Sequence, residues 1–369
     1  MKYYLIAGEA SGDLHGASLM RALKDQDPLA EFRFFGGDLM VAEGGELVKH
    51  YSDMAFMGFV EVIINLRKIL RNLAFAKQDI QSYQPDAVIL IDFPGFNLKI
   101  AAFVKSLGIK VFYYISPKVW AWNQKRVLKI KKVVDHMFCI LPFEVDFYKS
   151  WGMDVDYIGN PLMDAIKAHH ADDQFKITHN LDVRQIIALL PGSRKQEIER
   201  ILPVMLEAAH RLKNYQFIIA GAPTFDLAYY QQFIGSRQVK VLFNVTYDLL
   251  LNSVAAVVTS GTATLETALL KVPQVVVYKG APISISIARM VVKINYISLV
   301  NLIMNDKVVE ELIQEDCNAD KITTELLNLI EGGLYRTRML INYDELAEIT
   351  GPPGASERAA KLITKYLQN

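Results

Sequence analysis

The chain has 369 residues, of which 51% are hydrophobic and 22% charged, which is typical of a folded globular protein of about two domains. Its 40 basic and 40 acidic residues cancel, which disfavours a globally basic nucleic-acid-binding protein and an acidic disordered chain. The two cysteines, Cys139 and Cys317, are too few and too far apart for a disulfide framework or a cysteine-rich zinc site.

The first half of the sequence alternates short apolar runs with longer helical patterns. Apolar runs predict strands over residues 2–7, 86–92, 110–116 and 136–141, and a helix is predicted over residues 13–24. Runs that are apolar throughout are typical of a parallel sheet covered on both faces.

The same alternation restarts after Asn160-Pro161. The polar stretch from His169 to Arg184 is predicted to be a linker or surface turn. The strands predicted beyond it cover residues 186–190, 215–220, 239–243, 255–259 and 274–278, with a helix over residues 196–213. Two successive β/α units predict an α/β fold of two doubly wound Rossmann-like domains with a cleft between them.

The expected domain boundaries follow from this pattern. We expect an N-terminal domain over residues 1–165, a C-terminal domain over residues 166–345 and a separate final segment over residues 346–369. Gly351-Pro-Pro-Gly354 breaks the chain before a last amphipathic helix, predicted over residues 355–367. The N-terminus lacks the apolar region of a signal peptide, and no run of about 18 apolar residues predicts a membrane-spanning helix.

Ligands of doubly wound sheets bind at the carboxyl ends of strands, so the turn after each strand is a candidate site. The first turn carries Glu9 and Asp13 among glycines spaced GxxxGxxxG, unlike the dinucleotide fingerprint GxGxxG. Asp13 has an alternative role as a helix N-cap. Asp92 ends a predicted buried strand, where desolvation raises a carboxyl pKa and suits a general base. The alternative is a structural Asp that accepts backbone N–H bonds in the Pro94-Gly95 turn.

Two turns in the second half are suited to anions. Gly192, Ser193 and Arg194 lie between a strand and a helix, where backbone N–H groups, the helix dipole and a guanidinium favour phosphate. The second turn contains Gly261 and Thr262, and Glu266 one helical turn later is placed to accept hydrogen bonds from ribose hydroxyls. An ordinary helix start at the first turn and a capping box at Glu266 are the alternatives. Together the turns predict a ligand with a diphosphate, and no metal or cofactor site is expected.

Two segments combine apolar or aromatic residues with basic ones. The first runs from Met54 to Ile64, and the second from Lys118 to Lys132, which contains no acidic residue. Such segments suit contact with a membrane surface or a lipid acceptor, whereas burial in the core and a solvated basic face are the alternatives. The residues expected at this surface are Met54, Phe56, Met57, Phe59, Trp120, Trp122, Lys125, Arg126 and Lys129.

Seven motifs, spread over the whole chain in the right order, resemble the lipid-A-disaccharide synthase family of GT-B-type glycosyltransferases (glycosyltransferase family 19). They are Ala7–Asp13, Met57–Glu61, Ser116–Trp122, Leu141–Glu144, Leu189–Arg194, Ser260–Glu266 and Ser298–Leu302.

The resemblance implies a reaction and its partners. UDP-2,3-diacylglucosamine is the implied donor and 2,3-diacylglucosamine 1-phosphate the acceptor, giving a β-1,6-linked disaccharide 1-phosphate and UDP. The family inverts the anomeric centre without a nucleotide-bound metal, in the cytoplasm and peripherally on the cytoplasmic face of the inner membrane. Asp92 is then the expected base, with Glu9 the runner-up or a positioning partner, and Asn301 is expected to contact the donor or its diphosphate. GT-B enzymes commonly return the last helix to the N-terminal domain.

Other functions remain open from the sequence. Another GT-B enzyme of UDP-sugars is one alternative, either a different transferase or a UDP-N-acetylglucosamine 2-epimerase, and the epimerase would not need the apolar acceptor surface. A non-catalytic protein that binds a sugar phosphate is the alternative outside the enzymes. A dehydrogenase is disfavoured by the missing GxGxxG, and the sequence predicts no nucleic-acid partner and leaves the oligomeric state open.

Overall fold

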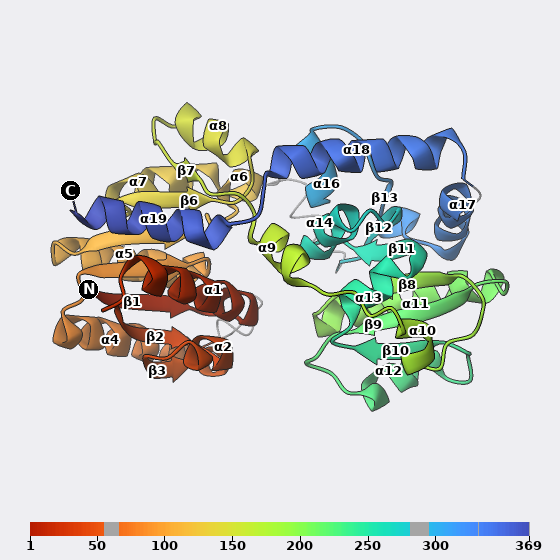
Figure 1. Cartoon of the computed structure of the whole chain (residues 1–369), viewed down its shortest axis with the longest axis horizontal. Coiled ribbons are helices and arrows are strands. Elements are labelled where there is room, and N and C mark those ends of the chain that lie inside the picture. The colour runs from red at the N-terminus through yellow and green to blue at the C-terminus, as the bar shows by residue number, and fades with distance from the viewer. Residues whose placement is uncertain (55–65, 281–294, 331, 369) are drawn as a thin grey trace. The chain divides into compact units, whose positions relative to one another are not determined.

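The computed structural model describes residues 1–54, 66–280, 295–330 and 332–368. It divides into two compact units, an N-terminal unit of Met1–Asp164 with Pro352–Asn369 and a C-terminal unit of Ala165–Gly351 (Figure 1). The first boundary lies within one residue of the expected one. The second follows residue 351 instead of residue 345, because α18 (Leu334–Thr350) continues through that point and the chain breaks only at Gly351-Pro352.

The N-terminal unit contains, among the described residues, a seven-stranded parallel sheet of order β3-β2-β1-β4-β5-β6-β7. Its strands are β1 (Lys2–Ala7), β2 (Glu31–Gly36), β3 (Glu46–His50), β4 (Ala87–Ile91), β5 (Lys110–Tyr114), β6 (His136–Cys139) and β7 (Asp156–Tyr157). Its helices are α1 (Ala10–Gln26), α2 (Asp38–Ala42), α4 (Leu66–Tyr83), α5 (Pro94–Ser106), α6 (Val119–Trp122), α7 (Val127–Val133), α8 (Phe143–Ser150) and α19 (Ala355–Gln368), with short 3₁₀ turns at Tyr51–Asp53 and Gln124–Arg126.

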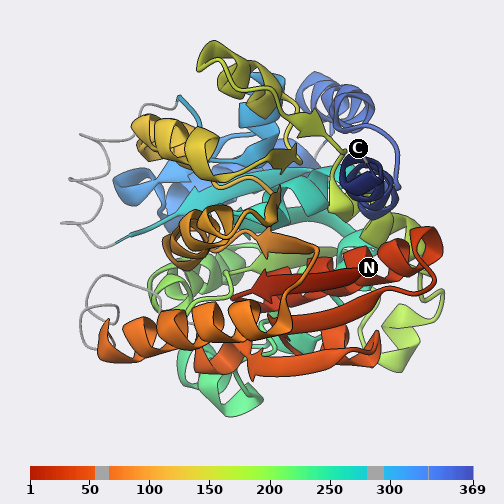
Figure 2. The same ribbon diagram turned by 90° about the vertical axis from the view of Figure 1, so that its left-hand side faces the viewer.

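Both faces of this sheet are covered by helices, which explains why its strands read as continuous apolar runs. Along β1, Tyr4 and Ile6 point to one face and Tyr3 and Leu5 to the other, and all four are fully buried. Figure 2 shows α4, α5 and α7 on the first side of the sheet and α1 and α19 on the second.

The C-terminal unit repeats this architecture with a six-stranded parallel sheet, counted over the described residues, of order β10-β9-β8-β11-β12-β13. Its strands are β8 (Ile186–Leu190), β9 (Gln216–Gly221), β10 (Lys240–Phe243), β11 (Ser253–Thr259), β12 (Gln274–Tyr278) and β13 (Glu311–Ile313). Besides α18, its helices are α10 (Phe175–Thr178), α11 (Lys195–Arg211), α12 (Leu227–Ile234), α13 (Thr246–Leu251), α14 (Thr262–Leu269), α16 (Leu299–Met304) and α17 (Ala319–Ile330), with a 3₁₀ turn at Gln314–Asp316; α9 (Pro161–Ala168) carries the chain into this unit.

The last helix, α19, is part of the N-terminal unit and packs beside α1 (Figure 1). Its apolar face, which includes Ala359 and Ile363, is buried in the same core cluster as the strands. The carboxylate of Asp164 accepts hydrogen bonds from the backbone N–H groups of Gly354 and Ala355, which occupies donors that a helix start leaves without partners. Hence the Gly351–Gly354 break returns the chain to the first unit.

Several elements differ from the sequence-based expectations. The stretch His169–Arg184 is not a linker: it forms α10, and Phe175 inserts into the core of the C-terminal unit. Strands β2, β3, β7 and β13 were not among the predicted ones. Arg33 interrupts the apolar run of β2, β3 is a half-exposed edge strand, and β7 and β13 have only two and three residues.

Candidate active site

The strand order of each sheet reverses at one point, where doubly wound folds bind ligands at the carboxyl ends of the strands. In the N-terminal unit the reversal lies between β1 and β4, whose following turns carry Glu9 and Asp92. In the C-terminal unit it lies between β8 and β11, whose following turns carry Arg194 and Thr262. Each unit therefore places its predicted residues at its own switch point.

The turn that carries Asp92 is a strained structure held by side chains. Asp92 and Phe93 both adopt positive φ angles, of 41° and 49°, which non-glycine residues rarely do. The carbonyl oxygen of Asp92 accepts hydrogen bonds from the Tyr113 hydroxyl at 2.6 Å and the Asn97 amide at 2.8 Å. A Cβ atom on Gly8 would lie 2.4 Å from the Phe93 ring, so any larger residue there would force this ring to move. The turn after β1 and the turn after β4 therefore pack directly against each other.

The carboxyl group of Asp92 has the environment of a general base. Burial raises its pKa, while the Lys118 ammonium and a hydrogen bond from the backbone of Phe93 act in the opposite direction. A desolvated carboxylate with a raised pKa is a stronger proton acceptor than one in water. The alternative of a structural Asp finds support only in that one Phe93 bond, within the described part of the chain.

Glu9 and Asp13 have different roles from one another. Glu9 is half-buried and occupies the N-cap position of α1, with extended backbone and no side-chain cap bond, so the alternative reading of Asp13 as the N-cap is wrong. Asp13 is 3% exposed and lies in the first turn of α1. Its carboxylate accepts the backbone N–H of Gly37 at 2.7 Å and those of Leu39 and Met40 at 3.1 Å. Asp13 therefore fixes the start of α2.

A buried carboxylate that was not among the predicted site residues lies between the segments that follow β5 and β6. Glu144 is 1% exposed and accepts hydrogen bonds from the Ser116 hydroxyl and from Trp120 Nε1 at 3.1 Å. It also accepts the backbone N–H groups of Ile140 and Leu141. Burial raises its pKa to about 7, against the effect of these four donors. Glu144 thereby connects the segment after β5 to the turn after β6. The motifs Ser116–Trp122 and Leu141–Glu144 contain both partners of this contact, but the sequence does not show that they meet.

The first turn of the C-terminal switch point presents a backbone suited to an anion. Gly192 has a φ of 105°, and a Cβ atom there would lie 2.5 Å from Glu197 Oε2. The side chains of Ser193 and Arg194 are exposed. Arg194 Nη1 lies 3.3 Å from Glu197 Oε1, and because an exposed ion pair is weak, the guanidinium remains available to a ligand. The turn leads into the N-terminus of α11, whose dipole favours negative charge.

The second turn brings Glu266 into a defined position. Gly261 is the N-cap residue of α14, and Glu266 lies beyond the N3 position that a capping box requires, so the capping-box alternative is wrong. The Tyr247 hydroxyl donates to Glu266 Oε1 at 2.9 Å. Burial raises the pKa of Glu266, while this hydrogen bond lowers it. The carboxylate is half-buried and lies one helical turn beyond Thr262.

Asn301, which was predicted to be part of the nucleotide site, has a structural role instead. Its side chain is fully buried, and Oδ1 accepts the backbone N–H groups of Val308 and Val309 at 2.9 Å each. Nδ2 donates to the Val309 carbonyl and to Glu311 Oε1, also at 2.9 Å. All four hydrogen-bonding positions of the amide are occupied by the protein. Asn301 therefore has nothing left for a ligand, and the prediction that it contacts the donor or diphosphate is wrong.

The predicted acceptor and membrane surface is only partly exposed. Met54 is 3% exposed and belongs to the core, and Trp120 is 7% exposed and bonded to Glu144, so both predictions are wrong. Phe56, Met57 and Phe59 lie outside the described residues.

The remaining residues of this surface lie on and before α7. Trp122 is 50% exposed, and the Arg126 guanidinium lies 5.2 Å from the centre of its ring. Lys125 and Lys129 are exposed, as is Leu128 between them. Within the described residues, this mixed apolar and basic patch is the part of the predicted membrane surface that is exposed. Among the described helices, none has the length and apolar character needed to span a bilayer.

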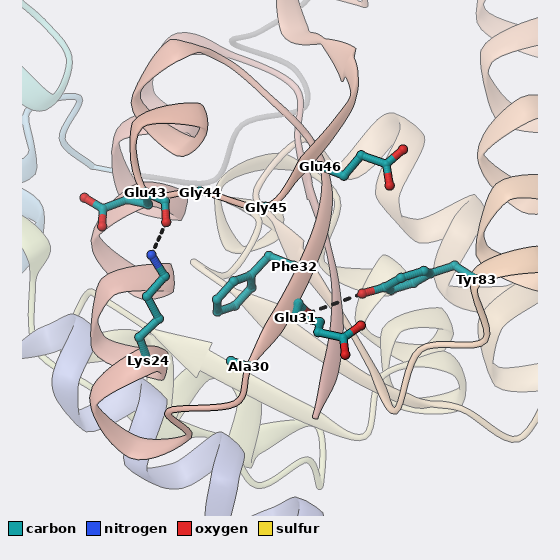
Figure 3. Close-up of a pocket in the computed structure, with 9 residues that line it drawn as sticks. All are labelled: Lys24, Ala30, Glu31, Phe32, Glu43, Gly44, Gly45, Glu46 and Tyr83. Carbon is teal, nitrogen blue, oxygen red and sulfur yellow. Dashed lines mark hydrogen bonds between the residues drawn. The ribbon is translucent and has the colours of Figure 1, made fainter.

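A surface pocket of about 410 Å³ lies at the amino ends of β2 and β3 in the N-terminal sheet (Figure 3). Glu31 and Glu46, at the amino ends of β2 and β3, line it, and Tyr83 donates to the Glu31 carbonyl at 3.4 Å. Because Asp92 follows the carboxyl end of its strand in a parallel sheet, this pocket is separate from the candidate site. Over the described ranges, no three His, Cys, Asp or Glu side chains gather as a metal site.

Comparison with known proteins decides the family. The sequence matches the family described as lipid-A-disaccharide synthetase over residues 3–356. It is 42% identical to the lipid-A-disaccharide synthase of Syntrophus aciditrophicus, with 99% of this chain and 97% of that one aligned. The corresponding enzyme of Geobacter sulfurreducens is 37% identical over 98% and 96% of the two chains.

The chain belongs to the lipid-A-disaccharide synthase family. The resemblance seen in the motifs is thereby confirmed, and the family is one of glycosyltransferases, which favours the transferase over the epimerase and over a non-catalytic binding protein.

Solved structures support the fold. A UDP-GlcNAc 2-epimerase from Neisseria meningitidis bound to UDP-GlcNAc matches with a TM-score of 0.70 and 13% identity, over 100% of both chains. The glycotransferase of kitacinnamycin matches with a TM-score of 0.69 and 14% identity, over 99% of both chains. At such identities the likeness shows the fold alone. The prediction of two doubly wound, GT-B-like domains is confirmed, and the lipid-A-disaccharide synthase family shares this architecture with epimerases.

Proposed function

We propose that the protein transfers 2,3-diacylglucosamine from its UDP ester to the 6-hydroxyl of 2,3-diacylglucosamine 1-phosphate, releasing UDP and a β-1,6-linked disaccharide 1-phosphate. Family membership over the whole chain supports the reaction class. The observation that carries the chemistry is Asp92, a desolvated carboxylate in a strained turn at the switch point of the first sheet.

Inversion at the anomeric carbon is a single displacement. As the acceptor oxygen forms its bond to C1, Asp92 takes the hydroxyl proton, and the bond between C1 and the diphosphate oxygen breaks, with its electron pair leaving on UDP. Glu9 is proposed as a positioning partner for the acceptor, since it follows the neighbouring strand β1. Because the base must be ionised, activity falls as the pH falls through the raised pKa of Asp92.

The nucleotide is assigned to the C-terminal unit. The backbone N–H groups of Gly192 and Ser193, together with the Arg194 guanidinium, hold the diphosphate at the start of α11. The turn of Gly261 and Thr262 approaches the phosphates as well. Glu266 accepts hydrogen bonds from the ribose hydroxyls. The leaving UDP is stabilised by the guanidinium and helix dipoles, which favour the negative charge that develops on it.

Both proposed substrates carry acyl chains, and the patch on and before α7 is suited to the surface from which they come. Trp122 and Leu128 expose apolar area, and Lys125 and Lys129 provide positive charge for anionic headgroups. We therefore propose a peripheral contact with the cytoplasmic face of the inner membrane.

The Asp92 assignment is tested by the Asp92→Asn variant, which keeps the size of the side chain and removes its basicity. The expected result is a loss of at least about 100-fold in kcat, typical of removing a general base, with wild-type affinity for UDP. Asp25→Asn, an exposed change on α1, is the matched control and should leave kcat unchanged. Wild-type turnover by the Asp92→Asn variant would remove Asp92 from the mechanism.

The membrane contact is tested by reversing two charges in the patch. A protein with Lys125→Glu and Lys129→Glu should bind vesicles of phosphatidylglycerol and phosphatidylethanolamine about tenfold or more weakly than the wild type, since each basic residue near an anionic surface contributes about 1 kcal/mol. The control carries Lys110→Glu and Lys213→Glu, which are exposed elsewhere. Equal binding by the two double variants would contradict the proposed surface.

A further inference from the structure

The proposed ribose-binding carboxylate, Glu266, is held by a tyrosine on another helix. Tyr247 on α13 donates its hydroxyl to Glu266 Oε1 on α14 at 2.9 Å. Within the described part of the chain, no hydrogen bond reaches Oε2 of the same carboxylate. One oxygen is thus occupied by the protein while the other keeps both lone pairs for a further donor.

The ring of Tyr247 packs against a histidine from the segment around residue 170. The His169 ring packs edge-on against the Tyr247 ring, with centroids 5.4 Å apart and planes at 81°. His169 Nε2 lies 3.0 Å from Asp248 Oδ1, which also accepts the backbone N–H of Asp172 at 2.8 Å. Three residues from two segments of the C-terminal unit therefore support the tyrosine, and the segment around residue 170 contributes two of them, His169 and Asp172.

Holding one carboxylate oxygen matters because a glutamate has three rotatable bonds. An unanchored side chain must lose that rotational freedom when a ligand binds, and the loss subtracts from affinity. A carboxylate fixed in advance does not incur this cost at the moment of binding. The Tyr247 hydrogen bond also favours the ionised form of the carboxylate, which is the better acceptor of hydroxyl protons.

We propose that Tyr247 is a positioning residue of the nucleotide site, which holds Oε1 of Glu266 so that Oε2 is presented to the ribose 2′- and 3′-hydroxyls. The inference rests on the proposed assignment of Glu266 to the ribose. If Tyr247 has this role, the preference for ribose over deoxyribose nucleotides depends on the Tyr247 hydroxyl, although this hydroxyl contacts no substrate.

The test compares UDP with 2′,3′-dideoxyuridine diphosphate, which lacks both hydroxyls, by calorimetry on the full chain. Tyr247→Phe should weaken UDP binding about tenfold, a typical effect of losing one hydrogen bond to a charged group, and leave the dideoxy nucleotide unaffected. Glu266→Gln should weaken UDP binding at least as much. The double variant should equal Glu266→Gln, because Tyr247 acts only through that carboxylate. In turnover, Tyr247→Phe should raise the donor KM and leave kcat at wild type.

The matched control is Tyr343→Phe, which removes another buried hydroxyl of the same unit, bonded to Gln274 Nε2, and should change neither affinity. Selective loss of UDP affinity in both Glu266→Gln and Tyr247→Phe supports the inference. If Glu266→Gln lowers both affinities equally, the ribose assignment itself fails. If Glu266→Gln is selective but Tyr247→Phe is silent, or lowers both affinities equally, the inference about Tyr247 fails alone.

Discussion

Replacing Asn301 with alanine tests whether this residue is structural, as its hydrogen bonds indicate, or part of the nucleotide site. The change leaves the buried backbone N–H of Val309 without an acceptor, while the N–H of Val308 keeps the carbonyl oxygen of Asp306 at 3.1 Å. An unsatisfied buried donor costs about 1–3 kcal/mol, so the Val309 amide alone lowers the free energy of unfolding by about that amount. Glu311 also loses one donor but keeps the N–H and hydroxyl of Ser298. The loss is measurable against the 5–15 kcal/mol that is typical of a domain.

The assay is urea unfolding followed by circular dichroism, with UDP affinity measured on the folded protein by calorimetry. Asn301→Ala should be destabilised by about 1–3 kcal/mol and still bind UDP with nearly wild-type affinity. Asn328→Ala, an exposed change on α17, is the control and should leave stability within about 0.5 kcal/mol of wild type. A variant of wild-type stability that no longer binds UDP would refute the reasoning and return Asn301 to the ligand site.

Three further predictions follow from other contacts. Gly8→Ala forces a Cβ atom against the Phe93 ring and should cost about 1–3 kcal/mol of stability and lower kcat by moving the base; wild-type kcat would contradict this. Glu144 has a pKa raised by burial from 4.5 to about 7, so the folded state binds a proton that the unfolded state releases between these pH values. Its contribution to stability is greatest below pH 4.5 and falls by about 3 kcal/mol up to pH 7; urea unfolding of Glu144→Gln should lack this slope, and an unchanged slope would refute it. Arg194→Ala breaks only an exposed ion pair with Glu197, so stability should hold while UDP affinity falls about tenfold or more; unchanged UDP affinity in calorimetry would count against the diphosphate site.

The sequence was most informative where local pattern and tertiary environment coincide. β1, β8 and β12 have the predicted limits because both faces of each strand are buried, which makes the whole segment apolar. Once those strands were located, the turns after them were located as well. The sequence placed Asp92 and Arg194 after strands, and the strand order of the structure shows that these strands flank the switch points.

What the sequence could not give was the environment of single side chains. Trp120 stands in a basic, aromatic segment that resembles a membrane contact, yet its indole is buried against Glu144. Asn301 belongs to a family motif, yet its side-chain amide makes all of its hydrogen bonds within the protein. Tyr247 carries no motif at all, and its role depends on the approach of α13 to α14. Burial and hydrogen-bond partners arise from contacts across the sequence, which composition and spacing do not encode.

The central claim is acceptor-dependent glycosyl transfer, and the most direct test is UDP release from UDP-2,3-diacylglucosamine in detergent micelles with excess EDTA. The account predicts that UDP is released only when 2,3-diacylglucosamine 1-phosphate is present and that mass spectrometry detects an equal amount of disaccharide 1-phosphate. A folded protein that binds UDP but releases none in the presence of the acceptor, or that alters the donor sugar without the acceptor, would contradict it.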